Sequence, residues 1–524
     1  MATQSNNRRP PERRRIIFKS SDHQDQTEVI FEEIERRQNQ ETRLFICGNN
    51  PVMAFSSHDG IQLRPLTARR LKTFLQAKAR FFKLKKINED LVPSPFNLSL
   101  ELCEHVLAKD DLTQWLPPIE RVLHSPVFDR EGNLCAKSGY HDGLKAWVEV
   151  DFELPATKPK PNSEQTKRAL EIIEEEFLGD FPFVDKASKA HAMALGLLSF
   201  VRPMIEGPTP LHLVTAPVPR TGKTKLVISL ALGTTGALPT MCPPSNDEEE
   251  WRKKITSTLL RSPQLVLIDN LPMHKRTDNH HLASVLTLGK WEDRALGTTE
   301  NVKLPNHAIW AATGNNPSLT SELVDRSVWI QLDPKVPEPS QRTGFKHEQI
   351  EQWAKDNRPM LYWAFVTLVR GWIAQGKPKF RRGHLGGFES WTRIIGGILD
   401  TAGVEGFLQN HHSLKTRSDG ETNEWQEFIS AWWNQYTKTP VGISELFQLS
   451  EANDLLDQTR GSGSDRSQRV KMANALANQL ERVFAVETQN GPLMLRVELL
   501  RVHKKKKTRL YKLTSLDQTQ VLNF

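Results

Sequence analysis

The segment from Leu211 to Thr224 places a lysine and a hydroxyl group directly behind an apolar strand. Its sequence is LHLVTAPVPRTGKT, and an apolar helix-forming stretch follows from Lys225. A strand that runs into such a turn can present backbone N–H groups and a helix N-terminus to phosphate oxygens. Lys223 would add a cation for the β- and γ-phosphates, and Thr224 a hydroxyl ligand for Mg²⁺. The pattern predicts a P-loop, and the residues expected to contact the nucleotide are Pro219, Arg220, Thr221, Gly222, Lys223, Thr224 and Lys225.

Three further side chains follow at positions suited to a bound triphosphate. The run QLVLID ends in Asp269, 46 residues after Lys223, where a carboxylate can hold Mg²⁺ and its water shell. The run AIWAAT leads into Asn315 after another 46 residues, and an amide there could orient the attacking water. Arg326 comes eleven residues later and could stabilise charge on the γ-phosphate of a neighbouring subunit. Each residue alone fits core packing equally well, but their order favours a phosphate-binding ATPase.

The predicted strands that carry these residues are separated by helix-length intervals. Strands that alternate with helices form a parallel sheet, in which the carboxyl ends of the strands meet at one edge. We therefore expect an α/β domain over residues 166 to 412, with its ligand at that edge. The predicted strands are Leu211–Ala216, Gln264–Ile268, Ala308–Thr313 and Val328–Leu332.

Several longer segments point to a known group of proteins. They are LPPIERVLHSPVFDREGNL, SGYHDG, DEEEWRKKI, LIDN, WEDRALG, LPNHAIWAATGNN, DRSVWIQLD and GGFESWTRIIGGIL. With the order of P-loop, Asp strand, Asn strand and arginine, they resemble the AAA+ superfamily. More narrowly, the chain is similar to the MCM-like and superfamily 3-like replicative helicases of phages, plasmids and other mobile elements, also described as phage primase/helicase proteins. The resemblance covers about residues 40 to 515.

The resemblance implies a fold and an assembly. The fold would be an AAA+ P-loop parallel sheet with a helical lid, preceded by an α+β accessory domain and followed by a winged-helix domain. The active state would be a homo-oligomer, a ring of six, with ATP and Mg²⁺ bound between subunits and single-stranded or forked DNA as partner. Thr224 and Asp269 would hold the metal, Lys223 and Asn315 would face the phosphates, and Arg326 would come from the adjacent subunit. A primase or polymerase is a candidate further partner.

Some positions depart from the family pattern. Pro217 stands where the P-loop usually has its first glycine, and Asn270 stands where most AAA+ proteins have a glutamate that polarises water. Glu249 or Glu250 could supply that base, or could simply be acids at a helix N-terminus. A second phosphate-sensing arginine could be Arg358 or Arg393, or both could be ordinary surface residues. No primase metal site is recognisable in the N-terminal part.

The rest of the chain divides by composition. Residues 1–25 are expected to be a disordered basic tail, 26–155 an accessory domain that could help grip DNA, and 156–165 a linker. A polar stretch from Ser413 to Asn423 separates the ATPase from a C-terminal domain over residues 424–524. There, GISELFQL and Gln468–Phe484 predict two helices, and Met494–Val502 and Thr508–Leu513 two strands, which is the outline of a winged helix.

Candidate DNA contacts lie in three places. Arg294–Pro305 predicts a hairpin in which Lys303 could reach DNA, and an ordinary surface turn is an equal alternative. The presumed wing tip could neutralise phosphates without reading bases, or could be a solvated turn; its lysines are Lys504, Lys505, Lys506 and Lys507. A helix predicted over Thr67–Phe82 has apolar residues on one side, Phe81 and Phe82 among them, and is basic on the other. Arg69–Lys86 holds eight Lys and Arg and no acid. That surface could follow a phosphate backbone or only keep the protein soluble.

Composition limits the remaining classes. The chain has 524 residues, 38% of them hydrophobic and 25% charged, with mean hydropathy −0.50 and a net charge of +8. No apolar run approaches the length of a membrane span, and the polar start does not resemble a secretory signal, so we expect no membrane partner and a cytoplasmic protein. The four cysteines form no C-x-x-C pair and are expected to be reduced.

These observations favour an ATP-driven DNA helicase or translocase of a mobile element. Two alternatives stay open. One is an AAA+ loader or adaptor that uses ATP as a switch and unwinds nothing, for which Asn270 is the best argument. The other is a non-enzymatic DNA-binding regulator that uses a winged helix and a decayed P-loop.

Overall fold

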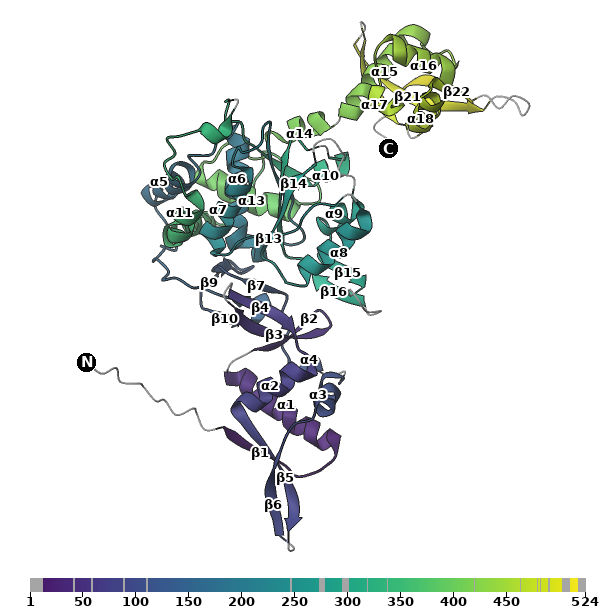
Figure 1. Cartoon of the computed structure of the whole chain (residues 1–524). Helices are drawn as coiled ribbons and strands as arrows, with labels where there is room; N and C mark the ends of the chain where they lie inside the picture. The colour runs from purple at the N-terminus through teal and green to yellow at the C-terminus, as the bar shows by residue number, and fades with distance from the viewer. Residues whose placement is uncertain are drawn as a thin grey trace. The chain divides into compact units, whose positions relative to one another are not determined.

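The computed structural model describes residues 13–516, with short gaps. The gaps are residues 41–42, 58–59, 88–89, 110–111, 246, 273–278, 295–300, 318, 337, 419, 462, 478, 481, 489–490 and 502–508. The chain forms two compact units, Met1–His412 and Ser413–Phe524 (Figure 1). Within the described part, no helix has the length and apolar character that a membrane span needs. All four cysteines are free thiols, as expected.

A five-stranded sheet forms the centre of the first unit (Figure 1). Its order is β13-β14-β17-β12-β18, and all four pairings are parallel. The predicted parallel α/β sheet is therefore confirmed. Because β12 and β14 both flank β17, the loops that follow these three strands meet at one edge. The strands are β12 (Leu211–Ala216), β13 (Thr240–Met241), β14 (Leu265–Leu271), β17 (Ile309–Asn315) and β18 (Ser327–Gln331).

Helices that precede the sheet in the sequence and helices that follow it pack with the sheet into one apolar core. Val214 of β12 and Leu267 of β14 belong to the same buried cluster as Phe365 and Trp391 of the helices that follow β18. Most of the helical segment expected to form a lid therefore belongs to the main core. The helices in this core are α5 (Ser163–Glu171), a π-helix (Ile172–Phe177), α6 (Lys186–Val201), α7 (Lys223–Thr235), α11 (Ile350–Asp356), α12 (Arg358–Ala374) and α13 (Glu389–Ala402). The short helix α10 (Ser321–Asp325) connects β17 to β18.

The expected linker ends earlier than predicted. Asn162 accepts a hydrogen bond from the backbone N–H of Gln165, and the Gln165 side chain accepts one from the backbone N–H of Asn162. This capping box starts α5 at Ser163, so the predicted linker to residue 165 already contains the first turn of the helix.

The N-terminal part is ordered nearer to the N-terminus than a basic tail of 25 residues would allow. Arg14–Phe18 form β1, which pairs in parallel with β5 (Ala79–Ile87), and α1 (His23–Gln40) follows. The tail prediction is wrong for these residues because Ile16 and Phe18 enter a buried cluster in spite of the arginines around them. Residues 1–12 lie outside the described part.

The helix predicted over Thr67–Phe82 is also shorter than expected. Thr67 caps α2 (Ala68–Lys78), and the chain continues directly into β5, which pairs with β6 (Asp90–Phe96). Phe81 and Phe82 therefore belong to a strand, where they point to opposite faces, and the prediction that both lie on one helix side is wrong. Stacking on Phe18 of β1 and strand pairing with Phe96 of β6 decide the conformation of Phe81.

Smaller sheets complete the N-terminal part. One has the order β2-β3-β4, and another the order β10-β11-β7. The elements are β2 (Leu44–Cys47), β3 (Asn50–Ser57), β4 (Gly60–Pro65), α3 (Leu100–Leu107), α4 (Leu112–Trp115), β7 (Arg121–Leu123), β8 (Val127–Phe128), β9 (Leu134–Cys135), β10 (Gly139–His141) and β11 (Ala146–Val148).

A hairpin lies between the Asp strand and the Asn strand, as the sequence predicted. Its strands β15 (Lys290–Arg294) and β16 (Asn301–Pro305) pair antiparallel. It begins four residues before the predicted start, and its tip lies outside the described residues. Helices α8 (Glu248–Leu259) and α9 (His280–Val285) precede it.

The second unit contains helices and a four-stranded sheet of order β19-β22-β21-β20. The polar separator Ser413–Asn423 is largely helical, because its Glu, Lys and Arg residues favour a helix. The predicted helix Gln468–Phe484 ends at Ala477, and the apolar residues beyond it form a strand that the sequence analysis missed. The elements are α14 (His411–Ser418), α15 (Gly420–Tyr436), β19 (Val441–Gly442), α16 (Ile443–Ala452), α17 (Asp457–Arg460), α18 (Asp465–Ala477), β20 (Val483–Thr488), β21 (Gly491–Arg501) and β22 (Arg509–Leu516).

Candidate nucleotide-binding site

The loop after β12 turns sharply into α7. Gly222 has a φ of +99°, which favours glycine, and Arg220 has a φ of +62°, which is uncommon for a residue with a side chain. The helix begins at Lys223, so its first unpaired N–H groups face the loop. A loop of this kind followed by a thirteen-residue helix can bind phosphate oxygens. Pro217 at the first glycine position leaves this turn intact.

Four predicted residues from three strand ends meet beside the loop. The Lys223 ammonium donates to Asn315 Oδ1 at 2.6 Å, and the Thr224 hydroxyl donates to Asp269 Oδ1 at 2.7 Å. The order of the sheet explains both bonds, because β17 lies between β14 and β12. The prediction that Lys223, Thr224, Asp269 and Asn315 form one cluster is thus consistent with the structure.

Asp269 is held in place by a second hydroxyl. Thr313 donates to the same Oδ1 at 2.6 Å and accepts from the backbone N–H of Asn270 at 2.9 Å. These bonds fix the carboxylate on the side of the strand that faces Thr224. A carboxylate and a hydroxyl are both hard oxygen ligands, so the pair suits Mg²⁺. Among the described residues there is no cluster of three or more His, Cys, Asp or Glu that could hold a metal by itself.

The charge of Lys223 is only partly balanced. Burial lowers the pKa of Lys223 below its ordinary value, and the nearby Asp269 carboxylate opposes that effect. A partly desolvated ammonium without a full ion pair attracts an anion more strongly than a solvated one. The arrangement can therefore bind phosphate groups and stabilise negative charge that develops on them.

A cavity of about 430 Å³ opens directly beside the loop. One wall is formed by residues 220–225, which include six of the seven predicted contacts. The other wall comes from two segments that sequence analysis missed, around Phe181 and between Pro339 and Ile350. These residues carry no motif, and only the fold brings them to the loop. The lining residues of the second wall are Asp180, Phe181, Pro339, Ser340, Arg342, Phe345, His347, Glu348 and Ile350.

Asp180 ties the second wall together. Its two carboxylate oxygens accept the backbone N–H groups of Lys346 and His347, both at 2.9 Å. The imidazole of His347 stacks on Trp353 with ring centroids 4.0 Å apart. Aromatic side chains held in this way beside a phosphate-binding loop could accommodate the flat base of a nucleotide.

The candidates for a general base lie on the surface. Glu249 pairs with Arg252 at 2.9 Å and Glu250 pairs with Lys253 at 2.8 Å, both within the first turns of α8. Neither lines the cavity. Their contacts are those of ordinary helix-terminal acids, which was the alternative interpretation. Asn270, next to Asp269, is exposed and has a φ of +64°.

Arg326 lies at the opposite edge of the sheet from its own P-loop. Its carbonyl accepts the backbone N–H of Leu211, the first residue of β12, at 2.9 Å, whereas the loop follows the last residue of that strand. A strand of six residues spans roughly 17 Å, so Arg326 cannot reach the loop of its own chain. Its guanidinium instead pairs with Glu322 at 3.1 Å and is 25% exposed.

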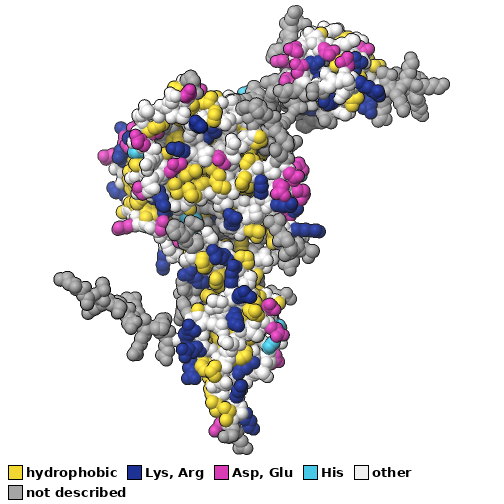
Figure 2. Space-filling model, in the orientation of Figure 1, with side chains coloured by type: hydrophobic (Ala, Val, Ile, Leu, Met, Phe, Trp, Pro, Cys, Tyr) yellow, Lys and Arg dark blue, Asp and Glu magenta, His cyan; other side chains and the backbone are white. Residues whose placement is uncertain are grey.

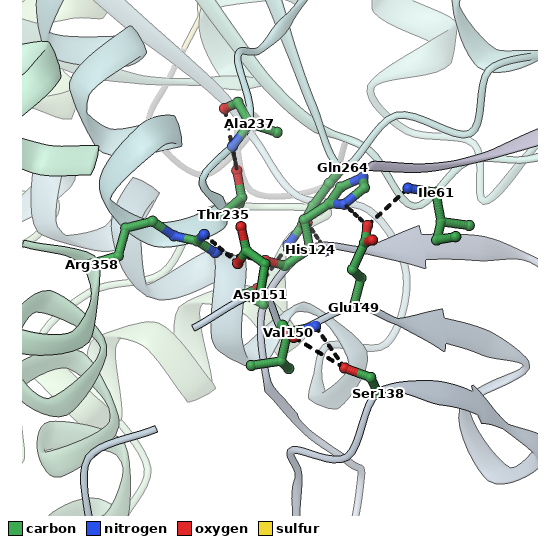
Figure 3. Close-up of polar contacts among 11 residues, drawn as sticks. Ile61, His124, Ser138, Glu149, Val150, Asp151, Thr235, Ala237, Gln264 and Arg358 are labelled. Carbon is green, nitrogen blue, oxygen red and sulfur yellow. Dashed lines mark hydrogen bonds and ion pairs between the residues drawn. The ribbon is translucent and has the colours of Figure 1, made fainter. Parts of the chain in front are cut away.

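Arg358 belongs to a different site. Its guanidinium pairs with Asp151 at 2.5 Å (Figure 3). It also donates to the carbonyl of His124 at 3.1 Å and lies over the Phe152 ring. It also touches Gly236, which follows the last residue of α7. Gly222 precedes the first residue of that helix, so Gly236 and Gly222 are about 20 Å apart. Arg358 therefore joins α12 to the N-terminal part and does not face the phosphate-binding loop. Arg393, on α13, is exposed.

Further polar contacts hold the N-terminal part to the ATPase-like part (Figure 3). The side chain of Gln264, next to β14, accepts the backbone N–H of His124 at 2.9 Å. His307 donates to Glu120 at 2.9 Å. Burial lowers the pKa of His307 to about 4, so at neutral pH it is an uncharged donor. We call these contacts, together with those of Arg358, the junction.

The predicted DNA contacts are only partly described. Lys303 lies on β16, half exposed, and pairs with Glu292 across the hairpin at 3.1 Å. Lys504, Lys505, Lys506 and Lys507 lie outside the described residues, as does the hairpin tip.

Comparisons with known proteins add a resemblance. No family model and no curated protein matches the chain. Two of the similar solved structures are the apo A form of the NrS-1 C-terminal region and SCCmec type IV Cch, an active helicase. The first has a TM-score of 0.34 and is 12% identical, and the match covers 84% of this chain and 98% of that chain. The second has a TM-score of 0.37 and is 11% identical, and the match covers 91% of this chain and 92% of that chain. Both TM-scores lie below 0.5.

Proposed function

We propose that the chain is an ATP-dependent DNA helicase or translocase that acts as a hexameric AAA+ ring in the replication of a phage, plasmid or other mobile element. The observation that carries the proposal is the pair of hydrogen bonds Lys223–Asn315 and Thr224–Asp269 at the carboxyl edge of a parallel sheet. These bonds join one cation, one hydroxyl, one carboxylate and one amide, which is the set that a triphosphate with Mg²⁺ requires.

Each residue would have a separate task in hydrolysis. Bound Mg²⁺ would neutralise charge on the phosphates. Thr224 and Asp269 would hold the ion, Lys223 would neutralise the β- and γ-phosphate oxygens, and the Asn315 amide would orient the attacking water. Binding requires Lys223 to exchange its bond with Asn315 for phosphate oxygens, which leaves that amide available for water.

The position of Arg326 supports a site shared between two subunits. Because the residue lies roughly 17 Å from its own loop, its only route to a γ-phosphate is through an adjacent copy of the chain. The Glu322 partner is half exposed, so the ion pair would exchange for phosphate at low cost. A ring in which every subunit supplies Lys223 to one site and Arg326 to the next satisfies this geometry.

The DNA contacts would come from two segments. The β15–β16 hairpin would carry Lys303 to a strand in the ring, and a winged helix in the second unit would add the lysines of residues 504–507. Both proposed contacts rest on the positive charge of these lysines and on the order of the elements in the chain. The contacts would be salt-dependent and largely independent of sequence.

An ATPase and strand-displacement assay tests the proposal. Wild type should hydrolyse ATP faster with single-stranded DNA and should separate a forked duplex. Lys223→Ala and Arg326→Ala should each reduce turnover by about 100-fold or more. Glu322→Gln is the matched control, because it removes the ion pair of Arg326 and leaves the guanidinium in place. An equimolar mixture of the two alanine variants should regain part of the activity, since some interfaces then combine an intact Lys223 with an intact Arg326.

Other results would select the alternatives. Asn270, where a glutamate is usual, favours an ATP-switch loader, and steady hydrolysis without any strand displacement would establish that function. A sequence-specific footprint that survives Lys223→Ala would indicate a DNA-binding regulator. Absence of recovery in every mixture would refute the shared site.

A further inference from the structure

The three-stranded sheet β1-β5-β6 has one covered face and one open face. On the covered face Phe18 stacks on Phe81 at 5.6 Å and meets the edge of Phe96 at 5.5 Å, within the cluster that includes α1, α2 and α3. Side chains alternate along a strand, so the residues between these point the other way. The open sheet face is formed by Arg15, Ile17, Arg80, Phe82, Leu84, Lys86, Leu91, Pro93 and Pro95.

An aromatic ring lies at the centre of this open sheet face. The pairing places Phe82 between Ile17 of β1 and Pro95 of β6, and the Arg15 guanidinium lies 4.7 Å from the centre of the Phe82 ring. Ile17 is 40% exposed and Leu91 is 64% exposed. A surface that only kept the protein soluble would not gather large apolar side chains in this way.

The charge on the open sheet face has one sign. Arg15 and Arg80 are direct neighbours across paired strands, which lie about 4.8 Å apart, and Lys86 follows along β5. None of the three forms an ion pair with an acid that the structure describes, and all three are exposed. Two like charges side by side destabilise a sheet unless a counter-ion lies over them. The open sheet face is therefore complementary to a polyanion.

Figure 2 shows Lys and Arg side chains gathered over the part of the molecule that holds β1, β5 and α2, with hydrophobic side chains among them. A partly exposed aromatic ring between cations on a sheet is a combination that can stack an unpaired base and hold the phosphates beside it. A duplex offers no free base to stack on. This distinction favours a single strand.

We propose that the open sheet face binds single-stranded nucleic acid, with a base stacked on Phe82 and phosphates held by Arg15, Arg80 and Lys86. This site is separate from the β15–β16 hairpin and from the second unit. It requires no nucleotide, so it can be tested independently of ATP hydrolysis.

The test measures binding of a labelled oligo(dT) of about twenty nucleotides to the full chain without ATP. The decisive comparison is Lys86→Gln against Lys85→Gln, because these exposed neighbours lose the same charge from opposite faces of one strand. Lys86→Gln should weaken binding and lower the salt slope by about 0.7, whereas Lys85→Gln should leave both unchanged. Phe82→Leu keeps an apolar side chain without an aromatic face and should weaken binding about 5- to 150-fold.

Further experiments identify the kind of nucleic acid that binds and the part of the chain that it contacts. Oligo(rU) and a blunt duplex of equal length distinguish RNA and double-stranded DNA, and either single strand should bind better than the duplex. A photoreactive 5-iodouracil oligonucleotide should cross-link to the peptide that contains Phe82. Thermal melting should show that all variants fold.

Four results would overturn the proposal. They are equal effects of the two lysine variants, full binding by Phe82→Leu, cross-links confined to other segments, and a preference for the duplex that does not respond to Phe82→Leu. If Phe82→Leu instead abolished self-association in sedimentation while oligonucleotide binding stayed constant, the open sheet face would be a contact between copies of the chain.

Discussion

The P-loop edge and the junction are both built from polar contacts between residues far apart in sequence. At the P-loop edge, the Lys223–Asn315 and Thr224–Asp269 bonds join groups that a ligand can also bind. At the junction, Arg358, His307 and Gln264 bind partners of the N-terminal part that no ligand has to displace. We therefore expect similar bonds to serve ligand binding in one region and fold stability in the other.

The surroundings explain the difference. Both regions border a cavity, of about 430 Å³ at the P-loop edge and about 810 Å³ beside His124, Asp151 and Gln264 of the junction. The difference lies in the charge, because the lysine at the P-loop edge is only partly neutralised. In the junction, Arg358 is buried between its partners and the Phe152 ring, so its bonds hold two parts of the fold together. Substitutions at the first site should change activity with little change in stability, and substitutions at the second should do the reverse.

Asp269→Asn should have the largest effect, and it falls on activity alone. The amide oxygen of asparagine can still accept from Thr224 and Thr313, so the melting temperature should stay near that of wild type. Loss of the carboxylate charge should reduce ATP turnover by about 100-fold, because the metal loses its anionic ligand. ATPase assays and thermal melting check both parts. A large loss of stability would show that Asp269 stabilises the fold, as the junction residues do.

Arg358→Met should give the opposite result. It removes the bonds to Asp151 and the His124 carbonyl and should lower the free energy of unfolding by about 2 to 3 kcal/mol. The loss is limited because Asp151 is 63% exposed and stays solvated. The KM for ATP should not change, because the guanidinium is about 20 Å from Gly222. Arg393→Met, at an exposed position on α13, is the control; a raised KM in Arg358→Met alone would restore its role as a phosphate sensor.

Acid should weaken the junction through His307. Its pKa is about 4 in the fold against 6.5 in the unfolded chain, so the unfolded state binds more protons between these values. Stability should therefore fall by about 2 kcal/mol from pH 7.5 to pH 5. The charged groups facing the imidazole are Glu120, Arg121 and Arg202, and the two arginines disfavour protonation further.

His307→Gln tests this dependence. Glutamine keeps an N–H donor for Glu120 but does not titrate, so denaturant unfolding at several pH values should show a flatter profile than wild type. An unchanged profile would show that other groups cause the acid sensitivity.

Glu249→Gln should have the smallest effect. The glutamate is exposed and pairs only within its own helix turn, so stability should change by less than about 0.5 kcal/mol. ATP turnover should stay within about two-fold of wild type, as measured beside Asp269→Asn. A loss as large as that of Asp269→Asn would instead identify Glu249 as the general base.

Local sequence signals predicted the ATPase-like part well where pattern and packing agree. The strand before the P-loop has the predicted bounds, and the parallel order of the sheet follows from strands alternating with helices. Predictions failed where a short apolar pair could serve either conformation. Phe81 and Phe82 fit one side of a helix, but contacts with β1 and β6 draw them into a strand.

The cluster of Lys223, Thr224, Asp269 and Asn315 was predictable because Asp269 and Asn315 lie at the carboxyl ends of parallel strands and Lys223 and Thr224 begin the helix after a third one. The wall of the cavity around Phe181 and His347 was not, since those residues carry no pattern of their own.

The amino-acid sequence by itself determined the order of elements and the chemical groups at the ends of the central strands, because strand periodicity and loop chemistry are local properties. Only the tertiary structure decided which arginine faces which partner. Arg326 and Arg358 look alike in sequence, but packing placed one at the outer sheet edge and buried the other against Asp151. Contacts between residues hundreds of positions apart depend on how the helices and sheets pack against one another, and no local sequence pattern encodes that packing.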